Sequence, residues 1–200
     1  QVDDALLSTM REVPKICKYM DMPLQHANGR ILRSMKRGGN AESLRRLVGH
    51  IREKVPGVTM RTSMITGYPG ETEEEFGELC NFVEEMQFDR LGTFTYSDEE
   101  GTASQLLDQK LGARVINSRR SRLMQIQARI SKKKNRQHLG KRYPLLVEGH
   151  SSESDLLWQG RLESQAPRID GVVLINDVEG VAPNPGDFRS VEITQTLDYD

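Results

Sequence analysis

The stretch VTMRTSMITGYPGETEEE (residues 58–75) contains a strand pattern, a glycine-rich turn and a helix start in succession. Its first nine residues are rich in β-branched side chains, which favours an extended strand. Thr72 and Glu75 have the spacing of a capping box, in which each side chain accepts a hydrogen bond from the backbone amide of the other residue. The stretch therefore predicts a strand over 58–66, a turn over 67–71 and a helix that begins just after Thr72.

The same alternation extends to both sides of this stretch. Apolar spacing predicts helices over 2–13, around 31–35 and after Asn40, and further strands over 16–24 and 90–96. Strands that alternate with helices predict a parallel sheet with crossover helices. A complete (β/α)8 barrel is excluded, because it needs about 250 residues and the chain has 200.

The pattern changes after a long basic helix that is expected from Ala113 to His138. Beyond Gly140, four short strand candidates are separated by turn residues, which predicts a small antiparallel barrel. These strand candidates are Tyr143–Val147, Leu156–Leu162, Gly171–Ile175 and Phe188–Thr194. We therefore expect two domains, residues 1–139 and 140–200.

Charge is divided in the same way along the chain. Residues 1–100 have net charge −4, residues 101–139 have +9 and residues 140–200 have −6, counting Lys and Arg against Asp and Glu. The total is −1, which excludes a strongly charged disordered chain. No apolar run approaches the roughly 18 residues that span a membrane, and no signal peptide is recognisable. The first residue is Gln1 rather than Met, so we expect the chain to begin inside a longer reading frame.

Cysteine usage points to a reducing cytoplasm. The two cysteines, Cys17 and Cys80, are 63 positions apart and lie in or beside apolar stripes, so buried and inert thiols are expected. The sequence contains no Cys-x2-Cys or Cys-x3-Cys pair, which argues against an iron–sulfur or zinc site made by this chain alone.

Three segments follow the predicted strands and are candidates for chemistry, because ligands of parallel sheets bind at the carboxyl ends of strands. They contain Gln25 and His26, then Gly67, Gly70 and Glu71, then Tyr96. The glycines let a backbone approach a ligand closely. From these residues alone, ordinary turn and helix-cap roles stay open, and Arg61 can equally form a structural ion pair.

Together the segments resemble one family, the radical S-adenosylmethionine methylthiotransferases. Three motifs carry the resemblance in order: Asp21-Met22-Pro23-Leu24-Gln25-His26-Ala27, Arg61-Thr62 with Gly67-Tyr68-Pro69-Gly70-Glu71-Thr72, and Phe94-x-Tyr96-Ser97 with Gly101-Thr102. Residues 140–200 resemble the family's TRAM domain. The resemblance implies the carboxyl half of a radical-SAM partial (β/α) barrel followed by a small all-β, OB-like TRAM domain.

Two branches of the family are open. One modifies an adenosine of transfer RNA, and the other modifies an aspartate on the twelfth protein of the small ribosomal subunit. Gln25-His26-Ala27, Glu99-Glu100 and Gln165-Ala166-Pro167-x-Ile169-Asp170 resemble the ribosomal-protein branch. An acidic carboxyl-terminal domain also suits a basic ribosomal protein better than RNA, whose phosphates attract basic surfaces.

The resemblance implies S-adenosylmethionine and two 4Fe-4S clusters in a full-length enzyme of the cytoplasm. It assigns cofactor contacts to Gln25, Arg61, Gly67, Gly70, Glu71 and Tyr96. Contacts with a basic ribosomal protein are expected at Glu163, Asp170 and Asp187, with no membrane partner and with nucleic acid not expected as the direct substrate. Since the Cys-x3-Cys-x2-Cys cluster motif is absent, these 200 residues alone are predicted to be inactive. A transfer-RNA enzyme and a non-catalytic binding module remain the alternatives.

Overall fold

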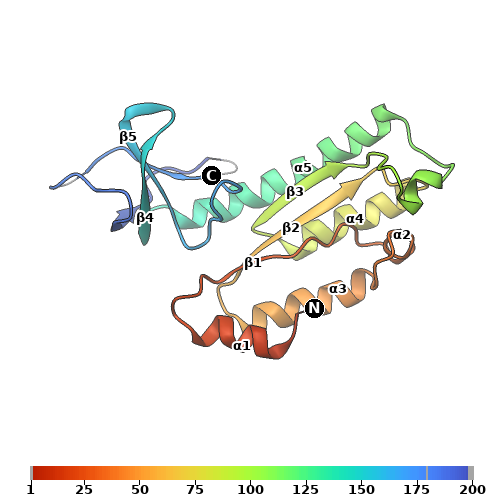
Figure 1. Cartoon of the computed structure of the whole chain (residues 1–200), viewed down its shortest axis with the longest axis horizontal. Coiled ribbons are helices and arrows are strands. Elements are labelled where there is room, and N and C mark those ends of the chain that lie inside the picture. Colours follow the sequence, from red (N-terminus) through yellow and green to blue (C-terminus); the bar gives the residue numbers. More distant parts are fainter. Residues whose placement is uncertain (1, 179, 198–200) are drawn as a thin grey trace.

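The computed structural model describes residues 2–178 and 180–197. Its first part alternates helices and strands, as Figure 1 shows. In chain order these elements are α1 (Asp4–Glu12), β1 (Tyr19–Asp21), α2 (Gly29–Ser34), α3 (Ala41–Lys54), β2 (Thr59–Thr66), α4 (Glu73–Met86) and β3 (Arg90–Thr95). The strands form one parallel sheet in the order β1-β2-β3, which confirms the predicted sheet.

The two faces of this sheet differ in burial. Side chains of Met20, Met60, Met64 and Leu91 join the apolar core that the helices complete. Alternate residues form the opposite face, which we call the open face because its side chains are half-buried or exposed. The open face consists of Tyr19, Asp21, Arg61, Ser63, Ile65, Arg90, Gly92 and Phe94.

The helix starts follow the capping residues read from the sequence. Asn40 caps α3, and Thr72 caps α4 through the predicted capping box with Glu75. The first strand is shorter than its predicted range of 16–24, because regular pairing with β2 covers only Tyr19–Asp21. Pairing resumes as a single parallel bridge between Gln25 and Met64.

A long helix connects the sheet to the rest of the molecule. After the short turn η1 (Ala103–Leu106), α5 (Ala113–Asn135) runs along the sheet and continues into η2 (Arg136–His138) (Figure 1). Leu123, Ile126 and Ile130 of α5 are buried in the same apolar core.

The remaining strands form a separate antiparallel sheet. They are β4 (Arg142–Ser151), β5 (Ser154–Arg161), β6 (Val173–Ile175) and β7 (Phe188–Glu192). Their order is β6-β5-β4-β7, and all three ladders are antiparallel. Gly160 is needed where β5 pairs with β4, because a Cβ there would overlap a methyl group of Leu145.

The two cysteines differ in environment. Cys80 is buried as expected, and burial raises the pKa of its thiol to about 11. Cys17 is exposed, so the prediction of a second buried thiol is wrong: it lies in the turn before β1, outside the regular pairing. No helix among residues 2–178 and 180–197 has the length and apolarity of a membrane span.

Candidate functional site

The carboxyl edge of the parallel sheet gathers most of the predicted site residues. Gln25 follows β1 and is held against β2, because its amide donates to the Ser63 carbonyl and its carbonyl accepts from the Ile65 amide, at 2.9 and 2.8 Å. Its φ of +72° lies in the left-handed region, which is uncommon for a residue with a Cβ. Such backbone outliers cluster at binding sites.

Glu71, which follows β2, is buried rather than presented to a ligand. Its side chain has no exposed surface and accepts three hydrogen bonds. The donors are the Gly67 amide at 2.6 Å, Arg119 Nη1 at 2.9 Å and His26 Nε2 at 3.1 Å. Glu71 therefore ties the loops that follow β1 and β2 to helix α5.

The hydrogen bonds of His26 define its tautomer. Nδ1 accepts from the Asn28 amide at 2.9 Å, so the ring proton is on Nε2 and is donated to Glu71. A neutral imidazole satisfies both contacts. The buried cluster then contains one carboxylate and one guanidinium, which balances charge in a site that excludes water.

The chain itself occupies the space beside both loop glycines. A Cβ on Gly67 would lie 2.5 Å from Ile116 of α5, and a Cβ on Gly70 would lie 2.9 Å from Gln109. The Gly70 amide also donates to the Gln109 carbonyl at 2.6 Å. These glycines permit close packing of residues 109–116 on the loop.

Aromatic side chains lie at the same edge. Tyr96, just after β3, donates its hydroxyl to Asp98 at 2.8 Å and packs edge-on against Tyr68, with ring centroids 5.5 Å apart. Phe94 is 57% exposed on the open face and is paired in register with Ile65. Sequence reasoning missed Phe94 and Ile65 as candidates, although period-two alternation along the two strands places them on one face.

Arg61 lies away from this edge, in the first half of β2. It pairs with Asp21 of β1, and its Nε lies 3.8 Å from Asp170 of the second sheet's β5–β6 loop. The Asp170 side chain is only 3% exposed and accepts a hydrogen bond from the Tyr19 hydroxyl at 2.6 Å. Burial first, and then this hydrogen bond, raise the pKa of Tyr19.

The three predicted partner residues therefore occupy different environments. Asp170 faces the parallel sheet and is largely buried, so we no longer propose it as a partner contact. Glu163 is exposed. Asp187 is partly buried and accepts hydrogen bonds from the Asn184 amide and from Arg189.

The residues fit S-adenosylmethionine better than they fit an iron–sulfur cluster. Ile65 and Phe94 are paired in register on the open face, and Gln25 follows the neighbouring strand. Apolar surface with an amide nearby suits a polar nucleoside. For a cluster, the two cysteines differ in burial. Within the part of the chain that the structure describes, no three His, Cys, Asp or Glu side chains are gathered as metal ligands.

Comparison with known proteins agrees with this architecture. The model of the Radical SAM superfamily matches residues 1–83, and the model of the TRAM domain matches residues 139–200. Residues 1–83 are therefore similar to radical SAM proteins, and residues 139–200 are similar to TRAM domains. The fold of the chain resembles that of coproporphyrinogen III oxidase (HemN) from Escherichia coli, a radical SAM enzyme, with a TM-score of 0.52 over 82% of this chain and 44% of that one. At 14% identity, that likeness shows the fold alone.

Curated relatives are more similar in sequence. The proteins named ribosomal protein uS12 methylthiotransferase RimO from Solibacter usitatus, Koribacter versatilis and Myxococcus xanthus are 50, 46 and 49% identical. The alignments cover 100, 100 and 98% of the chain but only 43, 40 and 41% of those proteins. The chain thus spans less than half the length of these relatives.

Proposed function

We propose that the chain is part of a methylthiotransferase that modifies an aspartate of ribosomal protein uS12. The observation that carries this proposal is the alignment of the whole chain with RimO proteins at up to 50% identity. The site supports it, because Gln25, Tyr96 and the open face meet at the edge where a radical SAM sheet would hold its cofactor.

Gln25, Ile65, Phe94 and Tyr96 would hold S-adenosylmethionine. The Gln25 amide can donate to and accept from a nucleoside, and Phe94 offers an exposed ring for stacking. When bound with a reduced iron–sulfur cluster, this cofactor supplies the chemistry that removes a hydrogen atom from an unactivated carbon. Glu71 contributes to the cofactor site indirectly, because its hydrogen bond with the Gly67 amide fixes the loop that follows β2 at the carboxyl edge of the sheet.

We propose that the clusters are held by a region outside these 200 residues. The chain has two cysteines, whereas each 4Fe-4S cluster is held by several thiolates. The isolated chain is therefore expected to lack methylthio transfer, and the full-length enzyme is expected to have it.

The protein partner would meet the TRAM domain. Residues 140–200 have net charge −6, which attracts a basic ribosomal protein and repels RNA. Glu163 is the exposed member of the predicted contact set. Reversing its charge should weaken association in a way that salt diminishes.

The test compares three proteins under reducing conditions with iron, sulfide and S-adenosylmethionine: the full-length enzyme, its Gln25→Ala variant and the 200-residue chain. Mass spectrometry of uS12 should show methylthiolation by the full-length enzyme only. Gln25→Ala should weaken S-adenosylmethionine binding about tenfold, the loss of one well-placed hydrogen bond.

Transfer by the isolated chain would refute the proposed location of the clusters outside these 200 residues. RNA binding by the full-length enzyme with a steep salt slope, together with unmodified uS12, would favour the transfer-RNA branch.

A further inference from the structure

The loop between β5 and β6 of the TRAM domain is internally fixed. The Leu162 amide donates to the Gln165 side chain, and the Ala166 amide donates to Asp170 Oδ2, both at 2.8 Å. The Asp170 amide in turn donates to the Ala166 carbonyl at 3.2 Å. The loop therefore presents the Asp170 carboxylate in one orientation.

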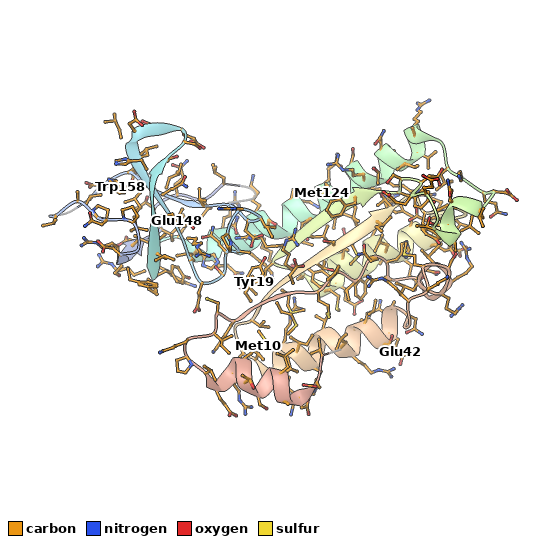
Figure 2. The ribbon with its side chains drawn as sticks, in the orientation of Figure 1. Met10, Tyr19, Glu42, Met124, Glu148 and Trp158 are labelled. Atoms are coloured by element: carbon orange, nitrogen blue, oxygen red, sulfur yellow. The ribbon has the colours of Figure 1, made fainter. Side chains whose placement is uncertain are left out.

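That carboxylate meets all three strands of the parallel sheet. Oδ2 accepts from Tyr19 of β1, while Oδ1 lies 3.8 Å from Arg61 Nε of β2 and 4.0 Å from Arg90 Nε of β3. Arg61 and Arg90 are direct neighbours in the register of the ladder. One residue of the TRAM domain thus contacts the open face at each strand. Figure 2 shows Tyr19 on the side of the sheet nearer to the TRAM domain.

Charge and burial make this contact selective for a carboxylate. Arg61 and Arg90 are 17 and 19% exposed, and Asp170 is 3% exposed. The two guanidinium groups face two carboxylates. One is Asp21, which pairs with Arg61, and the other is Asp170, which lies near both Arg61 and Arg90. Arg90 Nε is buried without a hydrogen-bond partner of its own. A buried charge without its counter-charge is costly. Withdrawal of Asp170 would leave Arg90 without this carboxylate, and it would also take the carboxylate away from both arginines.

The contact also provides a second point of attachment for the TRAM domain. The first is the chain itself, which leaves η2 and turns at Gly140, where φ is +71°. A single connection at such a turn leaves orientation to be set by other contacts. Near it, Asn135 donates to the Leu197 carbonyl at 3.2 Å. Asp170, in the β5–β6 loop, contacts the open face and fixes the orientation of the domain over it.

The attachment and the candidate site share one face of one strand. Arg61 and Ile65 are four residues apart in β2, which corresponds to about 13 Å along a strand. We propose that Asp170 is the positioning residue that sets where the TRAM domain, and a protein held by it, stand relative to the candidate site. This proposal rests on the proposed function only for the identity of that protein.

The first test uses the 200-residue chain and needs no activity. Asp170→Asn keeps the shape of the side chain and removes its charge, and Glu163→Gln is the matched control in the same loop. Circular dichroism verifies that each variant is folded. Small-angle scattering should show a larger radius of gyration for Asp170→Asn and no change for Glu163→Gln. Tyr19→Phe, a milder variant, should move the radius in the same direction. Unchanged radii for both Asp170→Asn and Tyr19→Phe would overturn the proposal.

The second test uses the full-length enzyme and separates positioning from general damage. Asp170→Asn should raise KM for uS12 about tenfold, the effect expected on losing one charged hydrogen bond, while the affinity for S-adenosylmethionine stays unchanged. An unchanged KM, or equal losses in KM and cofactor affinity, would overturn the proposal. If the unmodified enzyme fails to act on uS12, the proposed function fails, and the scattering comparison still decides the role of Asp170.

Discussion

Glu71 shows how a single buried carboxylate can organise a loop. Its three donors come from the Gly67 backbone, from His26 and from Arg119, and its side chain is fully buried. Removing one partner of such a pair leaves an uncompensated charge where water cannot reach it.

Glu71→Gln should therefore lower the free energy of unfolding by about 3 kcal/mol, the lower end for breaking a buried pair. The amide nitrogen introduced by the substitution would face donors, and Arg119 would keep only its exposed partner, Glu73. Urea denaturation measures the change. Glu74→Gln is the matched control, because Glu74 is exposed in the first turn of α4, the helix that begins just after Glu71. Equal losses in the two variants would contradict the role given to Glu71.

Glu75 provides a pH-dependent contribution at the same helix start. Hydrogen bonds from Arg30, the largest cause, lower the pKa of Glu75 from 4.5 to about 2. A carboxyl whose pKa is depressed on folding stabilises the folded state above its unfolded pKa. That contribution is lost as the pH falls from about 4.5 to about 2.

Glu75→Gln should destabilise the chain by about 1 kcal/mol at pH 7, because Arg30 is half exposed and solvent screens the pair. The difference from the unmodified chain should shrink steadily as the pH falls below about 4.5 and vanish only below about pH 2, where folded Glu75 becomes protonated. Unfolding curves at pH 7, 4 and 2.5 measure this convergence. A difference that is independent of pH would assign the effect to the capping box rather than to the charge.

At the scale of elements, the sequence predicted most helices and strands, because capping residues and periodicity are local signals. It could not predict that α5 covers the loop after β2, because Ile116 and Gly67 are 49 positions apart. Gly67 and Gly70 were expected to admit a cofactor, but Ile116 and Gln109 fill the space beside them. Glu71 was likewise assigned to the cofactor because its buried partners, His26 and Arg119, are distant in sequence.

Gly67→Ala should reveal this packing. The residue has φ +80°, and a Cβ would lie 2.5 Å from Ile116. The positive φ costs about 1 kcal/mol, and crowding adds about 1–3 kcal/mol. Gly101→Ala isolates the first term, because Gly101 has φ +79° with open space around it. Urea denaturation should give a larger loss for Gly67→Ala. Equal losses would mean that α5 yields to the added methyl group.

At the scale of the whole molecule, the change in charge and in strand pattern near residue 140 predicted the second sheet. The position of that sheet was beyond sequence reasoning, because Tyr19 and Asp170 are 151 positions apart. Asp170 was therefore predicted to face a partner, whereas its carboxylate is enclosed between the two parts of the chain.

The two parts also have separate apolar cores, which predicts separable unfolding. The core of the parallel sheet consists of buried residues between Leu7 and Ile130, whereas Leu145, Val147 and Ile193 are buried in the TRAM domain. The chain has one tryptophan, Trp158 in β5, whose ring centroid lies 4.0 Å from that of His150 (Figure 2). Its fluorescence therefore reports on the TRAM domain, while helical circular dichroism reports mainly on the α/β part.

Leu145→Ala should lower the stability seen by Trp158 fluorescence by about 2–4 kcal/mol, the cost of a buried cavity, and should shift the helical signal much less. Phe82 is a fully buried residue of α4. Phe82→Ala should lower the stability seen by the helical signal and should shift the Trp158 signal much less. Adding Asp170→Asn to either variant should widen the separation between the two transitions, because the enclosed carboxylate couples them. Coincident transitions in all variants would mean that the chain unfolds as one cooperative unit, with a coupling stronger than a single carboxylate provides.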